Sequence, residues 1–308
     1  PYHVLLTAAS GVYQEWQTRI AYYHYKKLRA MHPCSDVGGF TRLLNTRNAQ
    51  PDGLMDDIPT ILVKQLSYGR CDECDHGFIV MNRPWGLKQL IESAAFERIE
   101  ERFLFIMETD HLMLRPLRNT ATRDRPIGFG FYYMTHKYDS RKLYPVVKKY
   151  HDPDKLDPVG PSPMIIDKET LRRLVPPWWR LTLQMKRDRE TDAALGWVLE
   201  MWSYTINAGQ LGIKHEVQPH LQAEPANEYA LDLTPYYLLH YTFDLSYRTW
   251  KFSKRIFSGQ YPPAEIPPPP TRAPRNQQTF IRMMNEAIGA TTPWKPCHGD
   301  VCSSKKRT

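Results

Sequence analysis

The stretch FLFIMETDHLML, residues 103–114, joins a continuous apolar run to two carboxylates and a histidine. A short, uninterrupted apolar run is typical of a strand buried on both faces of a parallel sheet. Glu108, Asp110 and His111 follow it directly, although such groups are costly to bury without partners. Ligands of open parallel sheets bind at the carboxyl ends of the strands, which is where these side chains fall. The stretch therefore predicts a sheet that ends in a ligand site, with a cationic ligand offsetting the acidic groups.

Strand-like and helical patterns alternate on both sides of this stretch. Strands are expected at 3–9, 60–66, 78–82, 102–108, 127–134, 163–167 and 236–243, and helices at 13–29, 85–99, 192–209 and 276–290. Strand–helix–strand order is typical of a mainly parallel sheet with helices on its faces. The predicted fold class is therefore α/β.

We expect one domain with a C-terminal arm, because no internal repeat and no free-standing linker divides the sequence. Residues 1–258 would form the main body. Residues 259–308 would form an arm packed on it, with an extended Pro-rich segment at 265–275 and a helix capped by Asn276. The basic tail SSKKRT is expected to be disordered.

The composition limits the possible partners. The net charge is +8, but lysine and arginine are scattered among acids, which disfavours nucleic-acid binding. No apolar stretch reaches the ~18 residues needed to cross a bilayer. Because the sequence opens on Pro1 rather than Met, we expect a preceding segment that would have carried any signal or anchor.

The five cysteines allow two interpretations. CDEC and CHGDVC could supply a four-thiolate zinc site, but the spacing of the second pair is poor for a zinc ribbon. Disulfides formed in an oxidising lumen are the favoured alternative, and they would leave one odd thiol. The cysteines are Cys34, Cys71, Cys74, Cys297 and Cys302.

Carboxylates at i and i+2 after an apolar strand resemble the Asp-x-Asp element of nucleotide-sugar glycosyltransferases of the GT-A type. In that element one carboxylate ligates Mg²⁺ or Mn²⁺, and the other fixes the ribose or a metal-bound water. We therefore expect Asp110 and Glu108 to be metal ligands, with Glu108 also touching the donor. The late strand LLHYTF offers His240 as a further ligand. The alternatives are acids that cap the next turn and a hydrogen-bonded core histidine.

The segment WKFSKR, residues 250–255, gathers three basic side chains downstream of that histidine. Lys251, Lys254 and Arg255 are expected at the donor's diphosphate, which needs positive charge once the sugar bond breaks. A solvated basic loop is the alternative.

Several long motifs resemble, in order, those of the hydroxyproline O-arabinosyltransferases of plants and green algae. They are DVGGFTRLL (36–44), DDIPT (56–60), VMNRPWGL (80–87), ETDH (108–111), DPVGPSPMIIDKE (157–169), ETDAALGWVLEMWSY (190–204), LLHYTF (238–243) and MMNEAIGATTPW (283–294). The resemblance runs from about residue 2 to residue 294. It implies a GT-A-like fold, with residues 1–258 as the catalytic domain.

The resemblance also implies the reaction. L-Arabinofuranose would pass from UDP-β-L-arabinofuranose to the hydroxyl of peptidyl 4-hydroxyproline, with Mn²⁺ or Mg²⁺ and with retention of configuration. Family members are Golgi type II membrane proteins that act on hydroxyproline-rich acceptors such as extensins. The alternatives are a peptidyl-serine O-galactosyltransferase using UDP-galactose and a non-catalytic module that binds polyproline peptides. GWVLEM and NRPW favour the arabinosyl transfer. The sequence departs from the family pattern in two ways. Its five cysteines lie outside the shared motifs, and the stretch between HYTF and WKFSKR is shorter than expected.

Donor contacts are expected near the first strand and in two motifs. Thr7 and Ala8 would lie at the uridine and Arg42 toward phosphate or ribose, while Asn82 and Arg83 could reach the donor. His111 is expected as an outer-shell group, because adjacent side chains on a strand point to opposite faces.

Retention requires either a carboxylate nucleophile or front-side attack assisted by the departing diphosphate. Asp192 and Glu200 are the candidates to contact the sugar, since on one ideal helix both would border the same cleft. Asp192 could instead support the helix N-terminus. Glu200 has an apolar setting that would raise its pKa.

Hydroxyproline-rich acceptors adopt polyproline II and dock on aromatic-lined grooves. Trp178 and Trp179, and also Tyr132 and Tyr133, are candidate groove walls. Ser162 could line the acceptor side.

Overall fold

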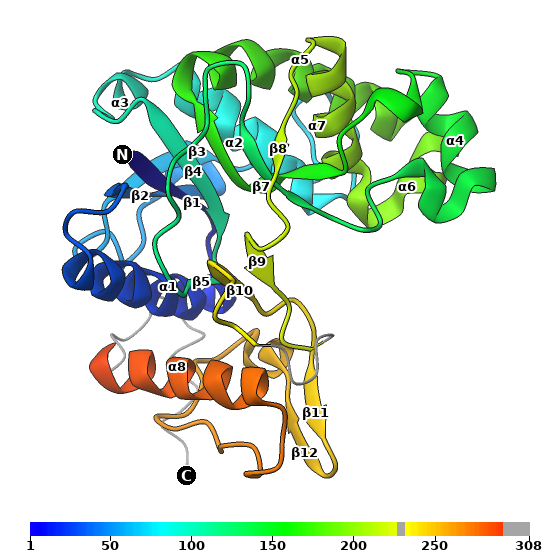
Figure 1. The fold of residues 1–308 in the computed structure, drawn as a ribbon. Coiled ribbons are helices and arrows are strands. Elements are labelled where there is room, and N and C mark those ends of the chain that lie inside the picture. The colour runs from blue at the N-terminus through cyan, green and yellow to red at the C-terminus, as the bar shows by residue number, and fades with distance from the viewer. Residues whose placement is uncertain (227–231, 292–308) are drawn as a thin grey trace.

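The computed structural model describes residues 1–226 and 232–291, and its centre is a seven-stranded sheet (Figure 1). The strand order is β3-β2-β1-β4-β7-β6-β8. The strands are β1 (Tyr2–Ala9), β2 (Val37–Thr46), β3 (Thr60–Lys64), β4 (Phe103–Glu108), β6 (Ile127–Gly130), β7 (Val159–Asp167) and β8 (Glu216–Val217). Strands β1 to β4 run parallel, whereas β7 is antiparallel to both β4 and β6. The predicted α/β class with a mainly parallel sheet is confirmed.

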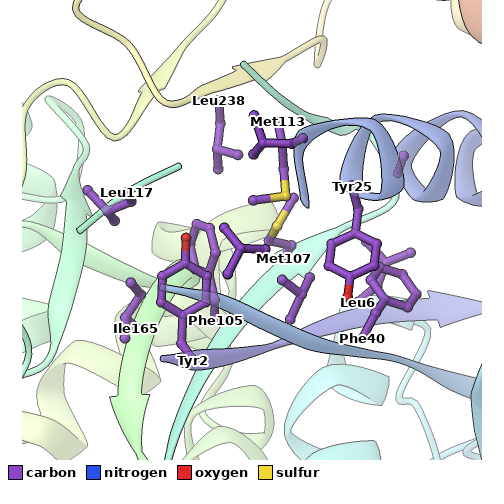
Figure 2. Packing of buried hydrophobic residues seen from close by; sticks show 14 of the residues in the cluster. Tyr2, Leu6, Tyr25, Phe40, Phe105, Met107, Met113, Leu117, Ile165 and Leu238 are labelled. Atoms are coloured by element: carbon purple, nitrogen blue, oxygen red, sulfur yellow. The ribbon is translucent and has the colours of Figure 1, made fainter. Parts of the chain in front are cut away.

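Helices cover both faces of this sheet. The helices are α1 (Val12–Met31), α2 (Asn82–Ile91), α3 (Ala94–Glu97), α4 (Ser140–Lys148), α5 (Lys168–Arg187), α6 (Arg189–Leu195), α7 (Leu199–Gln210) and α8 (Arg275–Thr291). Alternate residues of a strand face opposite sides, so Leu6 packs toward α1 while Leu5 packs toward α2, α5 and α7. Figure 2 shows the first of these clusters, in which Tyr25 of α1 lies with Phe40 and Leu6 of the sheet. Burial on both faces explains the uninterrupted apolar run of β4.

A second, smaller sheet lies beyond the carboxyl end of β4. It consists of β5 (His111–Met113), β10 (Leu238–His240) and β9 (Gln222–Ala223), in the order β5-β10-β9. A hairpin of β11 (Leu245–Tyr247) and β12 (Trp250–Phe252) follows, and then a short 3₁₀ turn, Lys254–Phe257. The chain thus returns to the end of β4 from far along the sequence.

The C-terminal arm packs against α1 through α8 (Figure 1). Phe280 and Met284 of α8 join Trp16 and Ile20 of α1 in one apolar cluster. The Pro-rich segment is tied to the helix, since Asn285 exchanges two hydrogen bonds of 2.8 Å with the Ile266 backbone. The expected tail lies outside the described residues.

The structure corrects several expected elements. Residues 78–82 are not a strand, because Ile79–Met81 form a 3₁₀ turn that leads into α2. The strands expected at 127–134 and 236–243 are short, spanning Ile127–Gly130 and Leu238–His240. The helix expected at 192–209 is broken at Gly196, whose φ is +51°, so α6 and α7 are separate helices.

Two further differences concern the C-terminal helix and the cysteines. Helix α8 begins at Arg275, so Asn276 lies inside its first turn rather than capping it, and Asn276 Nδ2 donates to the Pro225 carbonyl. Cys71 and Cys74 form a disulfide, which removes them from any thiolate zinc site, and Cys34 is an exposed free thiol. Cys297 and Cys302 lie outside the described residues.

Candidate active site

One carboxylate and two imidazoles converge where β4 ends. Ligand atoms of Asp110, His111 and His240 lie within 4.8 Å of one another, the only such group among the described His, Cys, Asp and Glu residues. His240 of β10 is directly opposite His111 of β5 in an antiparallel pair, so the two rings share a face and their centroids are 4.4 Å apart. Asp110 lies in the turn between β4 and β5. The turn and the cross-strand pair together place the three side chains in one spot.

His111 is fully buried, and only one of its two ring nitrogens has a hydrogen-bond partner among the described residues. Its Nδ1 accepts the Glu108 backbone N–H at 3.2 Å, so in the neutral ring the proton lies on Nε2. Burial, and then the neighbouring His240, hold the pKa of His111 well below its usual value, so the ring is neutral. Within residues 1–226 and 232–291, Nε2 has no hydrogen-bond partner. A buried donor without an acceptor suits a bound oxygen ligand, such as a phosphate oxygen or a metal-bound water.

Lys254 provides the positive charge closest to this carboxylate. Its Nζ lies 2.5 Å from Asp110 Oδ2, and the two side chains are only 7% and 15% exposed. His240 Nε2 lies 3.5 Å from the same oxygen. Burial would raise the pKa of Asp110, but Lys254 and His240 hold it well below its ordinary value. Asp110 is therefore an ionised carboxylate at neutral pH.

The donor set fits a divalent cation. A carboxylate oxygen and an imidazole nitrogen suit Mn²⁺, which also takes diphosphate and water oxygens, whereas Mg²⁺ prefers oxygen ligands alone. The unpaired Nε2–H of His111 would serve an oxygen bound beside the ion. Asp110 and His240 are thus the residues that could hold the metal.

Arg83 links two more carboxylates beside this group. From the first turn of α2, its Nη2 lies 3.0 Å from Glu108 Oε1 and its Nη1 lies 3.0 Å from Glu200 Oε2 on α7. Glu200 is 1% exposed. Burial, opposed by Arg83 and assisted by Glu108, raises the pKa of Glu200 to about 7. One guanidinium is shared between two carboxylates, so Glu200 retains a proton into the neutral range.

The residues expected at the nucleoside lie on the same edge of the sheet. Thr7 pairs with Glu108 across the parallel β1–β4 ladder, and its hydroxyl donates to the Met107 carbonyl at 3.1 Å. Ala8, the next residue, is buried. The Ser162 hydroxyl is also buried and lies 3.5 Å from the Ile106 carbonyl. Thr7 is therefore the nucleoside candidate nearest to the acidic turn.

Two residues expected to contact the donor have hydrogen-bond partners within the fold. Arg42 is buried and forms a bidentate pair with Asp52, at 2.8 and 2.6 Å, which ties down the loop after β2. Asn82 accepts the Leu66 N–H at 2.8 Å and donates to the Ile79 carbonyl at 3.0 Å. Both side chains are thus engaged with neighbouring residues of the fold.

Of the three basic residues expected at the diphosphate, one lies at the acidic turn. Lys251 is exposed, and Arg255 pairs with Asp244 at 3.1 Å on the surface, so only Lys254 of the three reaches the acidic turn.

Trp178 is fully buried, with its indole N–H donated to Ser203 Oγ at 3.1 Å, and Trp179 is buried against Trp85. These two rings offer no surface to a peptide.

Asp192 does not cap α6. Asp188 does, by accepting hydrogen bonds from the Glu190 and Thr191 backbone, while Asp192 pairs with Lys186 at 2.7 Å. The break at Gly196 also removes the single ideal helix on which Asp192 and Glu200 were expected to share a cleft.

Glu224 is one group that the sequence did not indicate. Its Oε2 accepts the Thr242 N–H at 2.9 Å, and its charge is among those that raise the pKa of His240, against the effect of burial. It lies in an irregular segment with no motif. Only the strand pairing brings it beside the histidine.

Solved structures share this architecture. The galactosyltransferase LgtC aligns with a TM-score of 0.50 and 13% identity, over 94% of this chain and 96% of LgtC. The bifunctional glycosyltransferase WbbM aligns with a TM-score of 0.51 and 8% identity, over 95% of this chain and 50% of WbbM. At these identities the likeness shows the fold alone, which is of the GT-A type.

Comparison of the sequence with known proteins shows the family to which the chain belongs. The Hydroxyproline O-arabinosyltransferase family N-terminal domain matches residues 2–217, and the C-terminal domain of that family matches residues 237–295. The chain belongs to the hydroxyproline O-arabinosyltransferase family. It is 36% identical to Hydroxyproline O-arabinosyltransferase RDN2 of Medicago truncatula and 37% identical to Hydroxyproline O-arabinosyltransferase 3 of Arabidopsis thaliana. Each alignment covers 96% of this chain and 82% of the relative.

A more distant relative is the peptidyl serine alpha-galactosyltransferase of Arabidopsis thaliana. It is 23% identical over 82% of this chain and 31% of its own length.

Within the described residues, no helix is long and apolar enough to cross a membrane.

Proposed function

We propose that this chain transfers L-arabinofuranose from UDP-β-L-arabinofuranose to the hydroxyl of peptidyl 4-hydroxyproline. The observation that carries the proposal is the convergence of Asp110, His240 and Lys254 at the end of β4, in a chain of this family. The sugar and the acceptor follow from the two relatives at 36% and 37% identity, both hydroxyproline O-arabinosyltransferases.

In the proposed site, Asp110 and His240 hold Mn²⁺ or Mg²⁺. The ion would neutralise the diphosphate and stabilise it as a leaving group. Lys254 adds a positive charge beside the same phosphates, and His111 donates its free Nε2–H to an oxygen there. Thr7 and Ala8 border the nucleoside, Arg83 fixes Glu108 near the ribose, and Lys251 and Arg255 contribute only long-range positive charge.

Retention is proposed to proceed by front-side attack. The bond between the sugar C1 and the diphosphate oxygen breaks, a bond from the hydroxyproline oxygen to C1 forms on the same face, and the hydroxyl proton passes to the departing diphosphate. The state of the nearby carboxylates supports this route over a covalent intermediate. Asp110 pairs with Lys254, while Glu108 and Glu200 share Arg83. Glu200 then acts as a positioning residue that holds Arg83, and Asp192 lies outside the chemistry.

The proposed setting is the Golgi lumen, with the catalytic domain of a type II membrane protein acting on extensin-like or other hydroxyproline-rich acceptors. A disulfide between Cys71 and Cys74 suits an oxidising compartment.

The test is incubation with a hydroxyproline-containing peptide, Mn²⁺ and a panel of UDP-sugars, with mass spectrometry of the product. The proposal expects a pentose on hydroxyproline from UDP-β-L-arabinofuranose alone. A hexose on serine from UDP-galactose would instead support the alternative suggested by the serine galactosyltransferase relative. Peptide binding without transfer of any sugar would support a non-catalytic binding module.

A further inference from the structure

Two large aromatic rings are exposed in the segment that follows β6. Tyr132 is 72% exposed and Tyr138 is 60% exposed, and their ring centroids are 5.7 Å apart in an edge-to-face arrangement. Single exposed apolar side chains are common, but adjacent exposed rings held against each other mark a contact surface. We call Tyr132 and Tyr138 the tyrosine pair.

Ring contacts link the tyrosine pair to a third tyrosine, Tyr133. Tyr132 contacts Tyr133 at a centroid distance of 5.2 Å, and Tyr133 in turn packs on Phe131 at 5.3 Å. Tyr133 is partly buried, and its pKa is raised by burial and then by the charge of Glu108. Tyr133 is therefore close enough to Glu108 to feel its charge, and ring contacts lead from Tyr133 to the exposed Tyr132 and Tyr138.

The backbone beneath the tyrosine pair is fixed. Phe131 and Met134 are buried in the core on either side of the exposed Tyr132, and the Met134 N–H donates to the Phe131 carbonyl at 3.0 Å. The Tyr138 N–H donates to the Thr135 carbonyl at 3.1 Å. The backbone that carries the two rings is therefore held by hydrogen bonds, which limits the entropy lost when a ligand docks on them.

We propose that the tyrosine pair is the docking surface for the hydroxyproline-rich acceptor, holding residues that flank the reacting hydroxyproline. The inference rests on the proposed function, which supplies the acceptor. Polyproline II rises about 3.1 Å per residue, so two successive residues span about 6 Å, close to the 5.7 Å between the two ring centroids. Such chains bind aromatic-lined surfaces because they are already extended and uncharged, and the phenol hydroxyls can bond to hydroxyproline side chains. The buried Trp178 and Trp179 cannot supply this surface.

The first arm of the test measures binding without catalysis. A fluorescently labelled peptide with several consecutive hydroxyprolines is titrated with the wild-type protein and with the double variant Tyr132→Ala/Tyr138→Ala. Two lost ring contacts predict a dissociation constant about tenfold or more higher in the variant. Met31→Ala is the matched control, because Met31 is also 63% exposed but lies at the far end of α1. Tyr132→Phe/Tyr138→Phe keeps both rings and should retain most of the affinity.

The second arm separates docking from chemistry. With the double alanine variant, KM for the long peptide should rise about tenfold with little change in kcat, while transfer to a blocked single hydroxyproline should match the wild type. Equal affinity of wild type and double alanine variant for the long peptide would overturn the docking surface, as would an equal loss on both acceptors. If the wild type binds the peptide through these rings but attaches no sugar, the proposed function fails and the docking surface stands.

Discussion

Replacing Glu200 by glutamine should remove a pH-dependent loss of stability. The side chain is 1% exposed and shares Arg83 with Glu108. Because its pKa is raised from an ordinary value of 4.5 to about 7, the folded state binds the proton more tightly than the unfolded state does. The stability that comes from this protonation is complete below the unfolded pKa and is lost as the pH rises through the folded one.

The magnitude follows from the two pKa values. The rise in the pKa from 4.5 to about 7 corresponds to roughly 3 kcal/mol over the whole titration, of which about 2 kcal/mol falls between about pH 5.5 and pH 8. Glutamine keeps the size of the side chain and cannot ionise. The free energy of unfolding of Glu200→Gln minus that of the wild type should therefore increase by about 2 kcal/mol between these two pH values.

The assay is denaturant unfolding of both proteins at the two pH values, with Glu92→Gln as control. Glu92 lies at the end of α2 with its side chain 53% exposed, so the same exchange there removes an acid without a buried titration. Only the difference between variant and wild type is used, which cancels the pH dependence of all other groups. A difference that stays constant between the two pH values would refute the shared-guanidinium account.

Three further predictions follow from the ion pairs. Asp110→Asn should lower arabinosyl transfer at least about 100-fold, equivalent to about 2.7 kcal/mol of barrier, with an unchanged far-ultraviolet circular dichroism spectrum; near-normal turnover would remove Asp110 from the chemistry. Lys254→Met should tighten Mn²⁺ binding in calorimetry without nucleotide, because the competing ammonium on Asp110 is lost, and should weaken UDP binding in the presence of Mn²⁺; two changes of the same sign would contradict this role. Arg42→Ala should lower the free energy of unfolding by about 3–5 kcal/mol, because Asp52 is left largely buried without its partner; a loss under about 1 kcal/mol would show that the pair is not structural.

The central sheet was predictable because strands buried on both faces consist of uninterrupted apolar residues. Uninterrupted apolar runs gave β1 and β4, and their order with amphipathic helices gave the α/β class. Helix α5 was not predicted, since Pro176 and Pro177 lie inside it and proline normally interrupts a helix. Its apolar stripe on the sheet outweighs that local cost. Strand β2 is not among the expected strands, and Gly38 and Gly39 lower the strand propensity of its first half. They are extended there, with Gly38 passing close to Glu101.

Site residues that belong to a local sequence motif were predictable. Contacts that only the folded chain brings together were not. Asp110 and His240 were named from the strand end and the late histidine, and the structure places them together, although their role as ligands stays a prediction. Asp110 and His111 do not alternate along one strand, because Asp110 lies in a turn and His111 begins a new strand. The pairing of Lys254 with Asp110 joins residues 144 positions apart, which no local pattern shows.

The central claim is that a divalent cation binds between Asp110 and His240 and carries the diphosphate of the donor. The most direct measurement is a crystal structure with Mn²⁺ and UDP, in which anomalous scattering locates the manganese. The account predicts one peak about 2 Å from an Asp110 carboxylate oxygen and from His240, with diphosphate oxygens on its open side. Bound UDP with the manganese elsewhere, or with no manganese at all, would contradict it.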